Sequence, residues 1–228
     1  ITSYDAFSAK TSHQAGVDCL LVGDSVGMVV YGFDSTLQVT TEMIARHTEA
    51  VRRAAPEAFV IADMPFMSNR KGFEACMNAA EELMRSGANA IKLEGARGNL
   101  EYVRHLVDSG IPVMGHLGLL PQTAKGKFRS KGKTDLEKKE LINDALALQK
   151  NGVFAIVLEC IKTSTSKKIT QALKIPTIGI GSSVNCDGQV LVTDDLLGLN
   201  NTKIKFVKKF VNLKKYINLG LKKFSSQV

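Results

Sequence analysis

The segment Gly87-Ala-Asn-Ala-Ile-Lys-Leu-Glu94 decides the fold, because the chain repeats it as Gly152-Val-Phe-Ala-Ile-Val-Leu-Glu159. A third segment, Gly16-Val-Asp-Cys-Leu-Leu-Val-Gly-Asp24, follows the same scheme and carries its acid one residue later. Glycine commonly ends a helix because it adopts the left-handed conformation without strain. The apolar run after each glycine is typical of a strand buried on both faces. Each segment therefore predicts a helix end, a buried strand and an acid at the carboxyl end of that strand.

Short apolar runs alternate with longer segments of helical period along most of the chain. This alternation predicts a parallel sheet covered by helices. About eight such units are typical of a (β/α)₈ TIM barrel, and an open doubly wound sheet is the alternative. The expected strands are residues 1–4, 18–22, 59–62, 89–93, 112–114, 154–158, 176–180 and 189–192. The expected helices are residues 5–15, 41–54, 71–86, 100–109, 135–150 and 165–173.

The composition is that of a globular protein. Of the 228 residues, 44% are hydrophobic and 23% are charged, which excludes wholesale disorder. No apolar run is long enough to predict a membrane span. The four cysteines lie far apart without a C-x-x-C pair, which argues against a zinc ribbon and a disulfide scaffold. We therefore expect a single large α/β domain in a reducing compartment.

The net charge of +8 comes from the end of the chain. Residues 201–228 hold eight lysines and no acid, so the rest of the chain is neutral. Apolar residues recur in this stretch with roughly helical spacing. We therefore predict a barrel over residues 1–200 and a basic helical extension over 201–228 that packs on it. Binding of a membrane surface or a nucleic acid by the extension is the less favoured alternative.

Polar residues follow the predicted strands at their carboxyl ends, where parallel α/β folds bind their ligands. Lys92 and Glu94 are two residues apart, so on a strand they point to the same face. A barrel would direct the whole set into one cavity. The set consists of Asp24, Ser25, Asp63, Lys92, Glu94, His116 and Glu159.

The same residues have purely structural explanations. An aspartate after a strand often caps the next helix, which would account for Asp24 or Asp63. Lys92 and Glu94 could form an ion pair, and His116 could be a buried core histidine. These structural explanations are less favoured as a set than one by one, because together they need several polar groups to lie at the same end of different strands by coincidence.

Three carboxylates near a lysine favour a hard cation such as Mg²⁺, which prefers oxygen ligands. The histidines and cysteines lack the spacing of a zinc site. A magnesium–lysine pair suits a 2-oxo acid or its enolate, and a carboxylate away from the metal could act as a base. The chain has no G-x-S-x-G elbow, no Walker loop and no G-x-G-x-x-G that opens a helix.

Six motifs follow one another along the chain: LLVGDSVGMVVYGFDSTLQVT, VIADMPFM, AIKLEG, PVMGHLGLLPQ, IVLEC and IPTIGIG. Together they strongly resemble the ketopantoate hydroxymethyltransferase family. The first of them is followed by HTEAVRR at residues 47–53, which makes the match highly specific. The resemblance implies a (β/α)₈ barrel that transfers a one-carbon unit from 5,10-methylenetetrahydrofolate to C3 of 3-methyl-2-oxobutanoate. The product would be 2-dehydropantoate, on the route to pantothenate and coenzyme A.

The resemblance also implies roles for the residues at the strand ends. Glu159 would take the C3 proton and His116 would line the site. The family is usually a cytoplasmic homo-oligomer, often a decamer, with no membrane or nucleic-acid partner. The implied Mg²⁺ ligands are Asp24, Asp63 and Glu94. The implied contacts of the oxo acid are Asp24, Ser25, Asp63 and Lys92.

Three features depart from the family pattern. The family carries a helical segment before the first strand, and this chain begins at that strand, so we expect weaker stability or oligomerisation. Gly179-Ile-Gly-Ser-Ser183 ends in serine where the family has glycine, and loop 123–133 is more basic. We expect these changes to affect ligand approach and contacts with folate. The alternatives are a non-catalytic remnant of the family and a magnesium-dependent C–C lyase or mutase acting on another 2-oxo acid.

Overall fold

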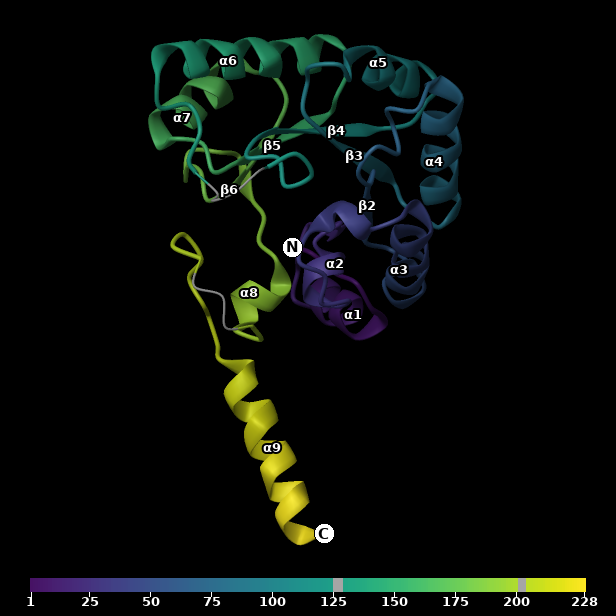
Figure 1. Cartoon of the computed structure of the whole chain (residues 1–228), viewed down its shortest axis with the longest axis vertical. Coiled ribbons are helices and arrows are strands. Elements are labelled where there is room, and N and C mark those ends of the chain that lie inside the picture. Colours follow the sequence, from purple (N-terminus) through teal and green to yellow (C-terminus); the bar gives the residue numbers. More distant parts are fainter. Residues whose placement is uncertain (125–128, 201–203) are drawn as a thin grey trace. The chain divides into compact units, whose positions relative to one another are not determined.

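A computed structural model describes residues 1–124, 129–200 and 204–228. Within these residues the strands form one parallel sheet in sequential order from β1 to β7. Figure 1 labels β2 to β6 of this sheet. Sequential order is that of a barrel wound in one direction, whereas a doubly wound sheet reverses its order near the middle. The TIM-barrel prediction is thereby confirmed. The strands are β1 Cys19–Val22, β2 Phe59–Asp63, β3 Ala90–Glu94, β4 Val113–Gly118, β5 Ala155–Glu159, β6 Thr177–Ile180 and β7 Gly188–Gln189.

The two end strands are shorter than the sequence predicts. Residues 1–4 form a single parallel bridge, from Thr2 to Leu21. The bridge consists of two backbone hydrogen bonds of 2.9 Å, from Ser3 N to the Leu21 carbonyl and from Leu21 N to the Ile1 carbonyl. Of the strand predicted at residues 189–192, only Gln189 lies in β7, and residues 190–192 are not in a strand.

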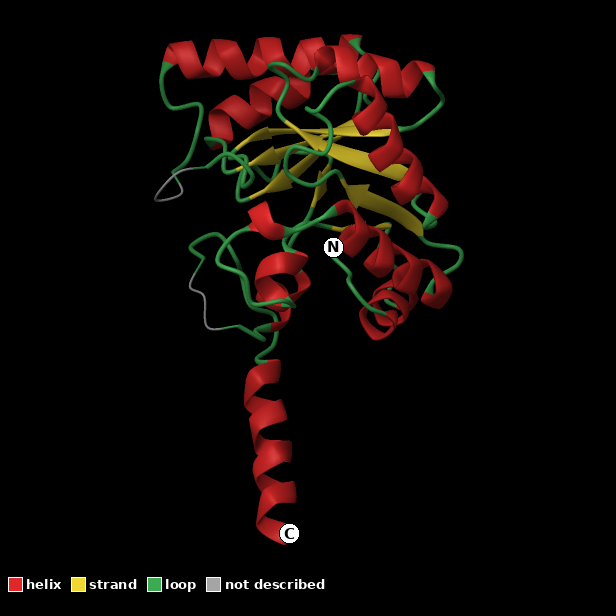
Figure 2. Cartoon of the chain, turned by 45° about the vertical axis from the view of Figure 1, so that its right-hand side comes forward, coloured by secondary structure: helices red, strands yellow, loops and turns green. Residues whose placement is uncertain are grey.

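Helices cover the outside of the sheet (Figure 2). Two of them begin with a capping box, Asp5 with Ser8 and Thr134 with Glu137, which satisfies free N–H groups of the first turn. The short α2 and η1 lie within residues 20–40 and were not predicted. The helices of this part are α1 Ala6–Gln14, α2 Val26–Val29, η1 Thr36–Gln38, α3 Thr41–Ala54, α4 Phe73–Arg85, α5 Leu100–Asp108, α6 Asp135–Lys150 and α7 Thr163–Ala172.

The glycines of the repeated segments have the predicted left-handed backbone. The φ angles of Gly16, Gly87 and Gly152 are +78°, +103° and +92°. A Cβ atom at Gly87 would also lie 2.6 Å from Cγ of Arg52. Another residue at position 87 would therefore meet both backbone strain and a steric clash.

The alternation of side chains along the strands creates two apolar cores. Outward residues pack against the helices in the larger core. Inward residues form a smaller core inside the curled sheet, made of Ile61, Ala90, Met114, Ala155 and Val157. Because side chains alternate, residues an even number of positions further along share that inward face. Those residues are Asp63, Lys92, Glu94, His116 and Glu159.

The chain divides into two compact units, Ile1–Val190 and Leu191–Val228. The second unit contains α8 Thr193–Leu197 and α9 Leu213–Gln227. Gly198 ends α8 in the left-handed conformation, with φ of +68°. The predicted C-terminal helix is present as α9, in which no residue is buried. Its packing on the barrel and a boundary at residue 200 stay predictions.

None of the helices in the described part of the chain is both long enough and apolar enough to cross a bilayer.

Candidate active site

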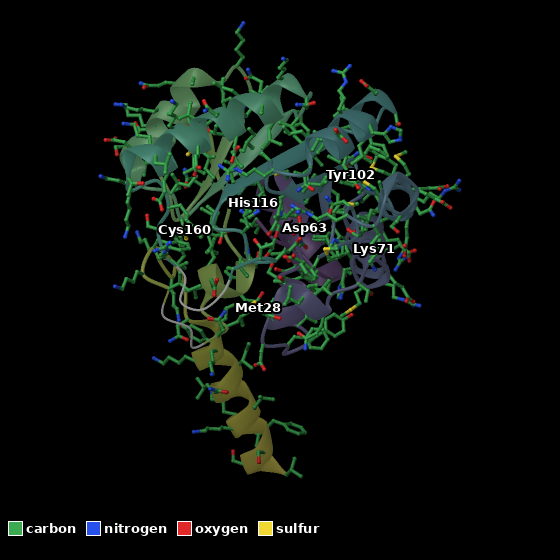
Figure 3. All side chains as sticks on the ribbon, turned by 45° about the horizontal axis from the view of Figure 1, so that its top comes forward. Met28, Asp63, Lys71, Tyr102, His116 and Cys160 are labelled. Atoms are coloured by element: carbon green, nitrogen blue, oxygen red, sulfur yellow. The ribbon has the colours of Figure 1, made fainter. Side chains whose placement is uncertain are left out.

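The structure brings the predicted polar residues together at the carboxyl ends of the strands. The sheet register sets Asp63 beside Lys92, and Glu94 beside His116. Figure 3 shows Asp63 and His116 near the middle of the curled sheet. The side chains of these four residues are almost fully buried. The register and the inward alternation together place them in one cluster.

Asp63 and Lys92 form a buried ion pair, with 3.1 Å between Oδ1 and Nζ. The other Asp63 oxygen accepts a hydrogen bond of 3.0 Å from the backbone N–H of Asp24. Neither aspartate caps a helix, because Ser25 and Gly72 occupy the N-cap positions of α2 and α4. The capping explanation is therefore wrong for both.

His116 lies between two glutamates. Its Nδ1 is 3.5 Å from Oε1 of Glu94, and its Nε2 is 3.2 Å from Oε2 of Glu159. Glu159 is the more accessible, since 16% of its side chain is exposed against 4% for Glu94. Glu159 is therefore a carboxylate that a ligand can reach and that a neighbouring imidazole orients.

The buried acids repel one another. Burial, together with the charge of Asp63, raises the pKa of Asp24 to about 7, although Lys92 acts in the opposite direction. Burial likewise raises the pKa of Asp63. Burial opposes the charge of Lys92, yet the acids around it raise its pKa. At Asp24, Lys92 therefore offsets only part of the repulsion from Asp63.

His116 is cationic at neutral pH. Burial and Lys92 lower its pKa, but its contacts with Glu159 and Glu94 outweigh them and raise the pKa to about 9. Burial would raise the pKa of Glu94, but His116 and Lys92 lower it. At pH 7 the cluster therefore contains two cationic groups, Lys92 and His116, beside its carboxylates.

Ser25 stands at the start of α2, and its hydroxyl is 2.8 Å from the hydroxyl of the buried Tyr4. Ser183 is also buried, and its hydroxyl accepts hydrogen bonds from Asn185, 3.1 Å from the backbone N–H and 3.0 Å from the side-chain amide. Ser183, which stands where the family motif has glycine, is thus hydrogen-bonded within its own loop.

Gln122 was not predicted as a site residue, although the motif PVMGHLGLLPQ ends on it. Its amide donates to Oδ2 of Asp24 at 2.8 Å, and its backbone N–H donates to Oε2 of Glu94 at 3.1 Å. Its position next to a proline in a loop gave no local pattern that indicated these contacts.

The oxygen-rich cluster fits a divalent cation. Within the described residues, Oδ1 of Asp63 and Oε1 of Glu94 are buried without a hydrogen bond of normal geometry. No three His, Cys, Asp or Glu side chains of that part of the chain converge as a preformed ligand set. Mg²⁺ commonly takes one or two carboxylates and completes its shell with water and substrate oxygens. A three-carboxylate ligand set therefore stays a prediction.

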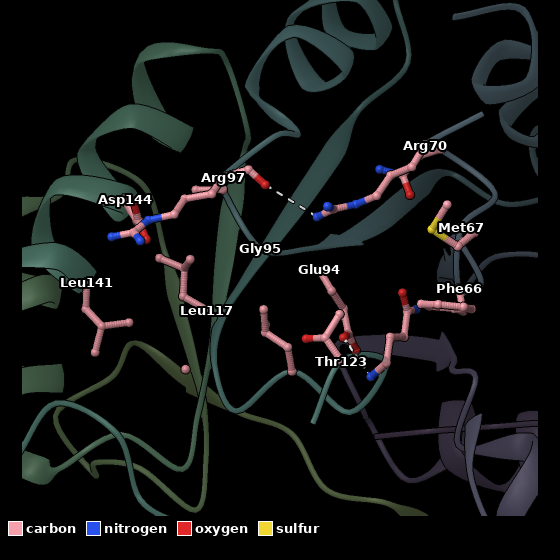
Figure 4. A pocket seen from close by; sticks show the side chains of 15 residues that line it. Phe66, Met67, Arg70, Glu94, Gly95, Arg97, Leu117, Thr123, Leu141 and Asp144 are labelled. Carbon is pink, nitrogen blue, oxygen red and sulfur yellow. Dashed lines mark hydrogen bonds between the residues drawn. The ribbon is translucent and has the colours of Figure 1, made fainter. Parts of the chain in front are cut away.

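A pocket of about 300 Å³ adjoins the cluster and shares Glu94 and Gln122 with it. Its other walls come from the loops after β2, β3 and β4 and from α6 (Figure 4). On one wall, Arg70 donates a long hydrogen bond of 3.4 Å to the Arg97 carbonyl. Residues 125–128 of the predicted basic loop lie outside the described residues.

Solved structures share this fold. A 2,3-dimethylmalate lyase of the PEP mutase/isocitrate lyase superfamily aligns with a TM-score of 0.59 and 20% identity, over 78% of this chain and 64% of its own. Phosphonopyruvate hydrolase, solved with oxalate and Mg²⁺, aligns with a TM-score of 0.62 and 12% identity, over 78% of this chain and 65% of its own. This chain thus spans slightly less than two thirds of both structures.

Relatives in sequence are much closer. The 3-methyl-2-oxobutanoate hydroxymethyltransferases of Bdellovibrio bacteriovorus and Coxiella burnetii are 51% and 50% identical to this chain. The alignments cover all of this chain and 88% and 87% of those proteins. The enzyme of the same name from Thermotoga neapolitana is 48% identical over all of this chain and 86% of its own. A profile of the ketopantoate hydroxymethyltransferase family matches residues 1–228, and the chain belongs to that family.

Proposed function

We propose that this chain transfers a hydroxymethyl group to C3 of 3-methyl-2-oxobutanoate, giving 2-dehydropantoate for pantothenate synthesis. The one-carbon donor in this proposal is 5,10-methylenetetrahydrofolate. Family membership supports the overall reaction, and the buried cluster around Lys92 is the observation that supports its chemistry. A cytoplasmic homo-oligomer, which in the family is often a decamer, belongs to the same proposal.

The substrate is a small anion with two neighbouring oxygen groups. Asp24, Asp63 and Glu94 would hold Mg²⁺, whose chemistry when bound is to attract electron density from the 2-oxo group. Lys92 would bind the oxo acid through its ammonium group, and Ser25 would hydrogen-bond to it. Burial strengthens these interactions because the site has a lower dielectric than water.

The C3 proton is removed by Glu159 in the first step. The electron pair of the C–H bond moves to the C2–C3 bond, and negative charge develops on the 2-oxo oxygen. Lys92 and protonated His116 stabilise that charge electrostatically. His116 also orients the Glu159 carboxylate through their 3.2 Å contact. C3 then forms a bond to the one-carbon unit, and both bonds between that carbon and the folate nitrogens break. Water supplies the hydroxyl group, and its second proton and the proton held by Glu159 go to the two folate nitrogens, which releases tetrahydrofolate.

Deuterium exchange at C3 of 3-methyl-2-oxobutanoate tests the first step without folate. We expect proton NMR in D₂O to show exchange that depends on Mg²⁺, with no comparable exchange of pyruvate. Glu159→Gln should lower the exchange rate roughly 10²-fold or more while substrate still binds. Comparable exchange by this variant would remove Glu159 as the base.

Product formation with 5,10-methylenetetrahydrofolate separates the proposal from its alternatives. Exchange followed by 2-dehydropantoate formation supports the transferase. Exchange without transfer, together with cleavage or rearrangement of another 2-oxo acid, would favour a lyase or mutase. A folded protein that catalyses neither reaction would refute the proposal and favour a non-catalytic remnant.

A further inference from the structure

Gln122 connects the ends of three strands that carry the carboxylates. Its backbone N–H donates to Oε2 of Glu94 at 3.1 Å. Its side-chain Nε2 donates to Oδ2 of Asp24 at 2.8 Å and to the Met64 carbonyl at 3.0 Å. These partners follow β1, follow β2 and end β3, whereas Gln122 lies in the loop after β4. One residue thus connects the groups that surround the proposed cation site.

The loop that carries Gln122 is itself fixed in place. Leu119 N donates to the Glu159 carbonyl at 2.9 Å, which attaches the start of the loop to the end of β5. Beyond Gln122, the N–H groups of Thr123 and Ala124 both donate to the Leu120 carbonyl, at 3.1 Å and 2.9 Å. Only 8% of Gln122 is exposed. The fold therefore fixes the position of its amide, and the side chain is not free to change rotamer.

A neutral amide suits this position chemically. An amide NH₂ group has two protons, and here Nε2 has two acceptors, so its donor capacity is used. A hydrogen bond from the amide to one oxygen orients the Asp24 carboxylate. Because the amide is uncharged, the carboxylate keeps its negative charge and its attraction for a cation. A lysine in the same place would neutralise Asp24 instead. Partners of this kind typically change metal affinity by about 10- to 100-fold when they are removed.

We propose that Gln122 is a positioning residue that holds the carboxylates of Asp24 and Glu94 in the orientation that binds Mg²⁺ and the 2-oxo acid. This inference rests on the proposed function. Gln122 acts through the two acids and contacts no reacting atom. Its removal should therefore weaken binding of the cation more than it slows the step at C3.

Two substitutions test this role. Gln122→Met keeps the length of the side chain and removes its donors to Asp24 and Met64, while the backbone N–H that donates to Glu94 stays. Gln122→Asn keeps the amide and shortens its reach by one methylene. The matched control is Gln149→Met on α6, where Oε1 accepts from Lys174 N instead of contacting the cluster. Mn²⁺ binding is measured by electron paramagnetic resonance and oxo acid binding by calorimetry in Mg²⁺. Circular dichroism checks that each protein is folded.

We expect both Gln122 variants to bind Mn²⁺ roughly 10-fold or more weakly than the wild type. Their apparent KM for the oxo acid should rise, and most of kcat should return at saturating Mg²⁺. The Gln149 control should stay within about twofold of the wild type in both measurements. If Gln122→Met does not fold, the comparison is made with Gln122→Asn.

Folded Gln122 variants with wild-type Mn²⁺ affinity and KM would overturn the assignment, even if their melting temperatures fell. That outcome would leave the proposed function intact, because the wild type would still bind the cation and the acid. A wild-type protein that binds neither would refute the proposed function itself, and the role of Gln122 with it.

Discussion

Replacing Asp24 with asparagine is expected to stabilise the metal-free protein at alkaline pH. The carboxyl of Asp24 has a pKa of about 7 in the folded chain, against an ordinary value of 3.8, because it is buried next to Asp63. Asparagine keeps an oxygen that accepts from Gln122 and carries no charge. The substitution therefore removes the electrostatic cost and retains the hydrogen bond.

The sign of this change in stability follows from proton binding. The folded protein holds this proton more tightly than the unfolded chain, so the penalty is absent well below pH 3.8 and complete above pH 7. The rise in the pKa of Asp24 from 3.8 to about 7 costs at most about 4 kcal/mol of folding free energy at pH 8. Each tenfold change in proton affinity corresponds to about 1.4 kcal/mol. At pH 5 the unfolded carboxyl is ionised and the folded one is protonated, which leaves a penalty of about 2 kcal/mol.

Urea denaturation in EDTA measures this effect at both pH values. Asp24→Asn should raise the free energy of unfolding by up to about 4 kcal/mol at pH 8, and by roughly half as much at pH 5. Asp108→Asn is the control, because Asp108 is exposed and pairs with Arg104, and it should change stability by less than about 1 kcal/mol. Destabilisation by Asp24→Asn at pH 8, or the same gain at both pH values, would refute the electrostatic reasoning.

Three further substitutions test other parts of the structure. Lys92→Met should destabilise the metal-free protein by about 3–5 kcal/mol in the same urea assay, because it leaves the buried Asp63 without its partner, and a change below about 1 kcal/mol would contradict this. Tyr4→Phe removes the hydroxyl next to Ser25 and should raise the KM for the oxo acid several-fold while the melting temperature changes little; an unchanged KM would separate Tyr4 from substrate binding. Gly87→Ala should lower stability by more than about 1 kcal/mol, measured by thermal unfolding, because of the backbone strain and the clash with Arg52, and a neutral result would show that the junction relaxes.

The inner face of the sheet was predictable because strand alternation is a local rule. Lys92 and Glu94 had to share a face, and the glycine before the strand indicated where that strand begins. The pairing of Lys92 was not predictable, because it depends on register: the structure pairs Lys92 with Asp63 on the neighbouring strand and not with Glu94 on its own. Register is a property of two strands, and neither strand encodes it alone.

Gln122 shows a second limit of local pattern. Its partners Asp24, Met64 and Glu94 are 98, 58 and 28 residues away in the sequence. Spacing and periodicity describe neighbours within a few residues, so they contain no signal for a loop that reaches back across three strands. The short α2 was missed for a related reason, since its four residues are too few to show a helical period.

The polar cluster is held in place by the apolar cores of the barrel. The inner core of Ile61, Ala90, Met114, Ala155 and Val157 lies on the same face of the strands as the polar residues and precedes them along the chain. Those apolar contacts, with the larger outer core, hold the strand ends at fixed separations although the acids there repel one another. Water would screen that repulsion if the site could open, but closed backbone ladders on both sides of β2, β3, β4 and β5 prevent the strand ends from moving apart. In the proposed function a bound cation would relieve this repulsion, and the rigid strand ends would hold the carboxylates in place for it.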